Sequence, residues 1–194
     1  MDLGIYPKLS IHKLMSGSNS ASLQIKVMNG PEIMVCKSEP HRLKEQGMTV
    51  FEAQGAKEPI IDIKGSDKLP FGAARLGIFE FDVFDCSSKK KIGTLTREAP
   101  KLFQRAVWYL EDARGAEIGS VSEINAVVAV LHELGLFPII PKAYDVRLGD
   151  NHVAKISRMS MIDVIWLDLS DDLNGRLDRR LGLAAGIVLC LVGK

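Results

Sequence analysis

The densest group of basic residues lies in the stretch SSKKKIG, which runs from Ser87 to Gly93. Its consecutive lysines, Lys89, Lys90 and Lys91, place three positive charges together. A cation near an anionic membrane surface contributes about 1 kcal/mol of binding free energy. Further basic residues follow along the chain: Arg97, Lys101 and Arg105. We predict that these six residues bind anionic headgroups, and the alternative is a hairpin tip that its lysines keep solvated.

An acidic group lies in the stretch DLSDD, which contains Asp168, Asp171 and Asp172. Several carboxylate oxygens together suit a hard cation such as calcium. The stretch lacks the glycine and the spacing of an EF-hand loop, however, and acidic residues also stabilise the N-terminus of a helix through its dipole. We therefore predict the start of a helix here and no metal site.

Motifs of the common enzyme classes are absent from the chain. The segment LHEL lacks the second histidine of HExxH, GAARLG lacks the Lys-Ser/Thr pair of a phosphate-binding loop, and no GxSxG occurs. Cys36, Cys86 and Cys190 are too widely spaced for a CxxC metal site, and Cys190 is expected to be a small buried residue. We predict a non-enzymatic protein without cofactors, and a catalytic site assembled from distant residues is the alternative.

The composition predicts one globular domain that spans residues 1–194. The chain has 25 Lys+Arg against 24 Asp+Glu, a formal net charge of +1, so no overall field favours a nucleic-acid partner. The first residues lack a basic region followed by an apolar run, so we expect no secretory signal. A cytoplasmic location follows, either free or peripheral to a membrane.

The most apolar segment is DRRLGLAAGIVLCLVGK, at Asp178–Lys194. Its uninterrupted apolar run, Leu181–Val192, is about 18 Å long as a helix, whereas the hydrocarbon core of a bilayer is about 30 Å thick. The arginines that precede it oppose insertion, so we expect no transmembrane span. A helix that is apolar on every side is normally surrounded by protein. We predict a helix over Leu173–Leu191, buried along its second half.

The rest of the chain repeats one pattern: an alternating run, a polar turn and a second alternating run, which is typical of a β-hairpin. The predicted turns lie at Asn29–Gly30, Gln54–Lys57, Cys86–Lys90, Ala113–Gly115 and Gly149–Asn151. Five hairpins, with further strands in YPKLSIHKLM and DVIWLDL, make about twelve strands. One segment differs, because residues 124–135 have apolar residues at helical spacing and predict a short helix outside the sheet.

About twelve antiparallel strands predict a closed barrel, since closure removes the exposed edges of a sheet. A barrel of this width leaves room for a filler along its axis. The apolar C-terminal helix is the expected filler, because its glycines and alanines make it slim. The predicted fold is therefore mainly β, a barrel around a central hydrophobic helix.

The hairpins FDVFDCSSKKKIGTLTRE and YDVRLGDNHVAKISRM, with the late helix LDRRLGLAAGIVLCLV, resemble the phospholipid scramblase and LURP-one-related families of the Tubby C-terminal-like superfamily. The resemblance covers residues from about Leu23 onward and implies a twelve-stranded barrel around a hydrophobic C-terminal helix. Tubby-type members bind phosphoinositide headgroups through basic residues, and scramblases are linked to lipid movement. This chain lacks the proline-rich arm and cysteine cluster of scramblases and the paired basic motif of Tubby, so no residue role carries over.

Three functions are compatible with these patterns. The first is a module that binds phospholipid or phosphoinositide headgroups at a membrane surface. The second is a structural or protein-interaction module, which an exposed apolar patch would indicate. The third is a tail-anchored, lipid-active protein, which requires the C-terminal helix to lie outside the barrel. The expected partner is accordingly an anionic phospholipid or a protein.

Overall fold

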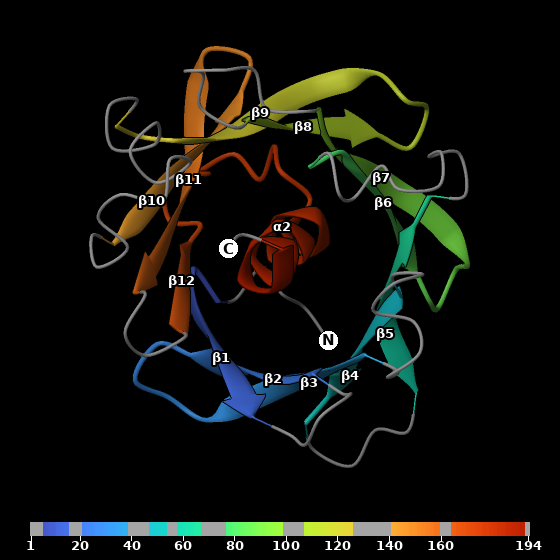
Figure 1. Ribbon diagram of the computed structural model, residues 1–194, viewed down its shortest axis with the longest axis vertical. Helices are drawn as coiled ribbons and strands as arrows, with labels where there is room; N and C mark the ends of the chain where they lie inside the picture. The colour runs from blue at the N-terminus through green and yellow to red at the C-terminus, as the bar shows by residue number, and fades with distance from the viewer. Residues whose placement is uncertain are drawn as a thin grey trace.

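The computed structural model describes most of the chain, namely residues 6–15, 21–38, 47–53, 58–66, 77–98, 107–125, 141–159 and 164–192. These residues form a closed barrel of twelve antiparallel strands with a helix, α2 (Arg179–Val192), along its axis (Figure 1). The strands are β1 (Lys8–Met15), β2 (Ala21–Val27), β3 (Glu32–Ser38), β4 (Gly47–Glu52), β5 (Pro59–Gly65), β6 (Phe79–Asp85), β7 (Lys90–Arg97), β8 (Val107–Asp112), β9 (Glu117–Glu123), β10 (Lys142–Leu148), β11 (Asn151–Met159) and β12 (Val164–Asp168).

Each strand pairs with its neighbours in sequence, and β1 closes the barrel against β12. The predicted hairpin turns within the described residues are present. Asn29, Gly115 and Gly149 adopt positive φ angles of 58°, 84° and 57°, the left-handed conformation that tight turns require. The predicted turn at Gln54–Lys57 and most of the predicted helix at 124–135 lie outside the described residues.

The core lies between the inner faces of the strands and α2. Alternate strand residues point inward, as period-2 patterning dictates, and α2 is buried without interruption from Leu181 to Cys190. Small helix residues allow this fit, because a Cβ at Gly186 would lie 2.9 Å from Cδ1 of Ile11. Cys190 is buried as expected, and burial raises the pKa of the Cys36 thiol to about 12. The central helix of the predicted fold is confirmed.

The start of α2 differs from the prediction, since the helix begins at Arg179 and not at Leu173. Asp172 is 4% exposed and accepts hydrogen bonds from the backbone N–H groups of Arg176 and Leu177, at 2.8 and 3.0 Å. These bonds hold residues 172–177 in a turn across one end of the barrel. Asp178 then caps the helix by accepting from the backbone N–H of Arg180 at 2.9 Å.

Candidate ligand-binding site at the C-terminal end of the central helix

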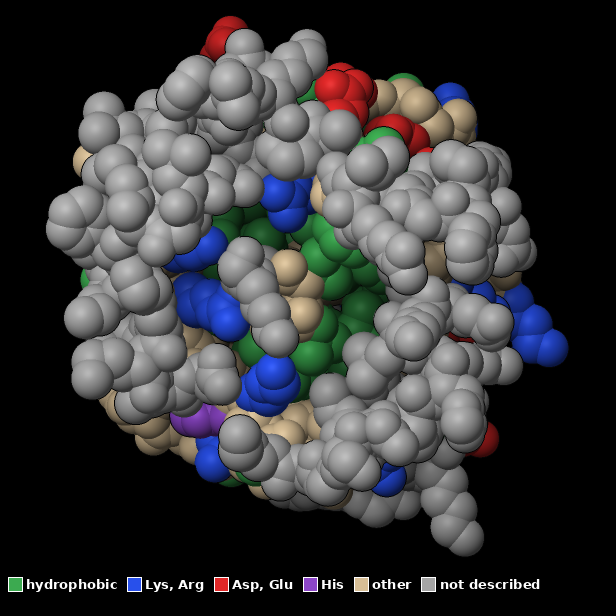
Figure 2. Space-filling model, in the orientation of Figure 1, with side chains coloured by type: hydrophobic (Ala, Val, Ile, Leu, Met, Phe, Trp, Pro, Cys, Tyr) green, Lys and Arg blue, Asp and Glu red, His purple; other side chains and the backbone are tan. Residues whose placement is uncertain are grey.

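The two ends of the barrel differ in character. One end holds the start of α2, the strand ends Asp85 and Lys90, and the turn that precedes the helix. The other end holds the last residue of α2, Val192, and the strand ends Met15 and Arg97. Figure 2 views the barrel from this second end, where blue side chains surround a hollow floored by hydrophobic ones.

At the first end, Arg180 forms ion pairs with Asp178 and Asp85, with Nη–Oδ distances of 2.7 and 2.5 Å. Arg179 donates to the carbonyl of Leu169 at 3.0 Å. These arginines therefore join the start of the helix to the strands and to the turn that precedes it. The carboxylates of the DLSDD stretch have separate partners: Asp168 forms an ion pair with Lys8, and Asp171 is hydrogen-bonded to His152.

The environment of Asp85 makes the stability of this end depend on pH. Hydrogen bonds from the Ser87 hydroxyl and from the backbone N–H groups of Ser88 and Ser87, with the Arg180 charge, hold the pKa of Asp85 well below its ordinary 3.8. The ionised form is therefore stabilised by folding, and this contribution is present above pH 3.8 and disappears as the pH falls through the lowered pKa.

We expect Asp85→Asn to unfold at a lower denaturant concentration than the wild type at pH 7. The difference should shrink below about pH 4, because the Asp85 carboxyl of the unfolded wild-type chain then takes up a proton while the folded one, with its lowered pKa, stays ionised. Urea titrations of both proteins from pH 7 to pH 3 measure this. A difference that stays constant over the range would contradict the assignment.

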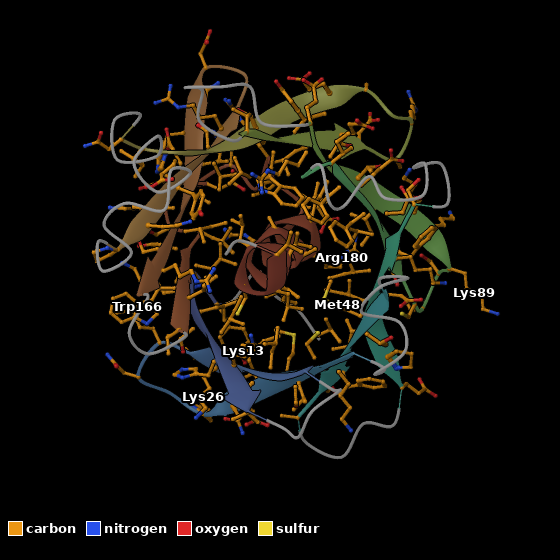
Figure 3. All side chains as sticks on the ribbon, viewed as in Figure 1. Lys13, Lys26, Met48, Lys89, Trp166 and Arg180 are labelled. Atoms are coloured by element: carbon orange, nitrogen blue, oxygen red, sulfur yellow. The ribbon has the colours of Figure 1, made fainter. Side chains whose placement is uncertain are left out.

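The six predicted headgroup-binding residues do not all lie together. Lys89 is exposed in the β6–β7 turn and points away from the barrel (Figure 3), and Lys90 is exposed beside it. Lys91 forms an ion pair with Asp82, with an Nζ–Oδ1 distance of 2.6 Å. Arg97 lies at the opposite end of β7, about 23 Å from Lys90 along the strand. Lys101 and Arg105 lie outside the described residues.

A different basic group lines the inner rim at the second end, around the last turn of α2. Each member occupies the next inward position beyond a buried apolar residue of its strand, and all are partly buried. The members are Lys13 on β1, Arg158 on β11, Lys142 on β10 and Arg97 on β7. We call these four residues the basic arc, because their strands belong to one continuous half of the barrel, from β1 through β12 to β7.

The register of the sheet concentrates charge within the basic arc. Lys142 lies directly opposite Arg158 on the same face of the β10–β11 pair. Like charges in directly opposite positions destabilise a sheet, by up to about 1 kcal/mol. Lys13 lies two strands from Arg158, about 10 Å along the rim, and Figure 3 shows Lys13 inside the barrel.

Neighbouring groups orient two of the arc residues. Arg158 Nη1 is 3.5 Å from the carbonyl oxygen of Leu189, in the last turn of α2, where the helix dipole favours a cation. The guanidinium of Arg97 lies over the ring of Trp108, 5.9 Å from its centroid. Among the described strands, Glu123 of β9 is the acidic residue that occupies an equivalent inward position at this end of the barrel, and it is buried. In the order of strands, β9 lies between β10, which carries Lys142, and β7, which carries Arg97.

Arg97 is the one arc residue among the six predicted headgroup-binding residues, whereas Lys13, Lys142 and Arg158 were not predicted, because each is isolated from other basic clusters along the chain. Each arc residue could have been recognised from its position in the alternation of inward and outward residues along its strand. A basic residue in step with the inward apolar residues of a strand, such as Lys13 after Leu9 and Ile11, must point into the barrel.

Comparison with known proteins adds no relative. No protein-family model, no curated protein and no solved structure matches the chain. The resemblance to scramblase-like and LURP-one-related proteins therefore stays an expectation, and the function has to be argued from the site itself. No helix among the described residues is long and apolar enough to cross a membrane.

Proposed function

We propose that this protein is a non-enzymatic module that binds anionic phospholipid headgroups at a membrane surface through the basic arc. The observation that carries the proposal is an excess of positive charge at one end of the barrel. Among the residues that the structure describes there, four basic side chains and one acidic side chain occupy inward positions. Lys142 and Arg158 lie directly opposite each other in the sheet, so a phosphate group bound between them would receive charge-assisted hydrogen bonds from both side chains.

The alternatives have less support. A tail anchor requires α2 outside the barrel, and α2 lies inside with ten consecutive residues buried, Leu181 to Cys190. A protein-interaction surface requires an apolar patch. The exposed large hydrophobic residues of the described chain are instead distributed over both ends and the outer wall, namely Leu14, Met28, Ile124, Trp166 and Leu173. Leu14 and Ile124 directly follow Lys13 and Glu123, so they suit contact with a membrane at the arc end.

The test is co-sedimentation of the full chain with lipid vesicles. We expect binding to vesicles that contain phosphatidylserine or a phosphoinositide, and none to pure phosphatidylcholine. The double variant Lys13→Gln/Lys142→Gln removes two cations, worth about 2 kcal/mol together, and should weaken binding about 30-fold. A cooperative melting transition of this variant checks that weaker binding does not result from unfolding.

The matched control is Lys89→Gln/Lys90→Gln, which removes the same charge from the exposed turn at the other end. It should retain most of the wild-type binding. Loss of binding in this variant, with the arc variant unaffected, would move the headgroup site to the turn. Equal binding to charged and uncharged vesicles would contradict the proposed function.

A further inference from the structure

His152 joins two parts of the chain at the end of the barrel opposite the basic arc. Its Nδ1 is hydrogen-bonded to Oδ1 of Asp145 on β10, and its Nε2 lies 2.9 Å from Oδ2 of Asp171. Asp171 belongs to the segment between β12 and α2, residues 169–178, which we call the pre-helix turn. We call Asp145, His152 and Asp171 the histidine bridge, because they connect the β10–β11 hairpin to this turn.

An irregularity in the pairing of β10 and β11 positions His152 for both contacts. The register shifts near His152, where β11 contains one extra residue, Val153. A bulge of this kind redirects the side chains beside it. Val153 and Ala154 are consecutive and both buried, and His152 lies on the outer surface beside Asp145.

The two contacts together require the imidazolium form of the ring. An ionised carboxylate only accepts hydrogen bonds, so each ring nitrogen must carry a hydrogen to bind one. Neutral imidazole carries a hydrogen on one nitrogen, and the lone pair of the other would face a carboxylate oxygen. Asp145 is ionised at neutral pH, because hydrogen bonds from Arg147 and His152 outweigh the effect of burial and hold its pKa below the ordinary 3.8.

Charged groups from several elements surround the ring. They are Asp145 and Arg147 on β10, Asp150 in the hairpin turn, Asp171 in the pre-helix turn, Asp168 on β12 and Lys8 on β1. Histidine is the side-chain type in this group that ordinarily changes charge between pH 5 and 8. The side chain of Asp145 is 16% exposed and is also held by Arg147, whereas that of Asp171 is 60% exposed. Loss of a proton therefore breaks the contact with Asp171.

We propose that the histidine bridge is a pH-sensitive device, in which the protonated ring holds the pre-helix turn against the β10–β11 hairpin and the neutral ring releases it. The bridge stabilises the turn at low pH, and this contribution is lost as the pH rises through the range in which histidines lose their proton. The turn supports α2, because Asp172 within it binds the N–H groups of Arg176 and Leu177, and Asp178 caps the helix. Release therefore loosens the start of α2, independently of headgroup binding at the other end.

Hydrogen exchange of the full chain measures the pre-helix turn directly. The amides of Gly175, Arg176 and Leu177 all donate to Asp172 within it. Their protection, corrected for the intrinsic exchange rate at each pH, should fall about fivefold between about pH 5.5 and about pH 8.5. This is the change expected for loss of one exposed, charge-assisted hydrogen bond.

The controls separate the bridge from other effects of pH. The amides of Arg114 and Ala116 bind a carboxylate in the β8–β9 turn, which contains no histidine, and their corrected protection should stay constant. His152→Gln and Asp171→Ala remove the bridge, so the pre-helix turn should be weakly protected at every pH. His12→Gln removes the other histidine of the described chain, on β1, and should retain the wild-type pH dependence.

Two results would overturn the proposal: constant protection of the turn in the wild type, or an undiminished fall in His152→Gln. The wild-type pH series decides the question even if a variant fails to fold. Nitrogen NMR of the His152 ring supplies a second measurement. Both ring nitrogens should carry a hydrogen at about pH 5.5 and only Nδ1 at about pH 8.5, and a single hydrogen at the lower pH would contradict the bridge.

Discussion

Replacing Ile187 with aspartate is expected to abolish the folded state. Ile187 is 0% exposed in the middle of α2, at the centre of the barrel. The substitution removes a buried side chain, which costs about 2–5 kcal/mol, and places a carboxylate among apolar residues, which costs several more. The total is comparable to the whole stability of a domain, about 5–15 kcal/mol. Circular dichroism and gel filtration should show an unfolded or aggregated chain.

The matched control is Leu173→Asp, which makes the same kind of change in the turn before the helix. Leu173 is 90% exposed, so the variant should melt within a degree or two of the wild type. A chain that ends at Asp178 should behave like Ile187→Asp, because it lacks the barrel filler. A soluble truncated chain with the native β-sheet spectrum would show that α2 is dispensable, and the account of the core would then be wrong.

Replacing Gly119 with alanine is expected to destabilise the barrel by about 3 kcal/mol and to lower its melting temperature by about 10 °C. A Cβ at this position would lie 2.0 Å from the carbonyl oxygen of Arg147 and 2.8 Å from Cδ2 of Leu148. The oxygen belongs to the backbone of β10, so relief requires separation of β9 from β10. Thermal unfolding of the purified variant measures the effect.

Gly115→Ala separates this steric effect from the general cost of replacing a glycine. Gly115 lies in the β8–β9 turn with φ 84°, and an added Cβ there meets nothing within 4 Å. The variant should lose only the cost of a left-handed conformation, about 1–2 kcal/mol. If Gly115→Ala proved as destabilising as Gly119→Ala, close contact between β9 and β10 would not be the cause.

The sequence predicted the β-hairpins well because they are local. Alternation of apolar and polar residues, interrupted by Asn-Gly or Asp-Ala-Arg-Gly, specifies two strands and the turn between them without reference to the rest of the chain. The predicted start of α2 was wrong because an acidic residue can bind backbone N–H groups in a turn as well as at a helix start. Asp172 looked like a helix cap, but its carboxylate binds the N–H groups of Arg176 and Leu177 in a turn, and Asp178 is the residue that caps the helix.

The candidate site, in contrast, depends on contacts between residues that are far apart in the sequence. Lys89, Lys90 and Lys91 are adjacent in sequence and were predicted to bind headgroups together with Arg97. In the structure Lys91 forms an ion pair with Asp82, and Arg97 lies at the other end of the barrel. Lys13 and Arg158 look unrelated in the sequence. They become neighbours only because β1 and β11 both pair with β12.

The sequence by itself determined the class of fold, because strand periodicity, turn residues and an all-apolar terminal helix each depend on contacts over short distances or on burial alone. Closure of β1 onto β12 and the register of β10 on β11 were decided by the tertiary structure. They depend on the packing of all the strands around one helix. The basic arc is a product of that closure, since its four residues come from four strands that span the chain from Lys13 to Arg158.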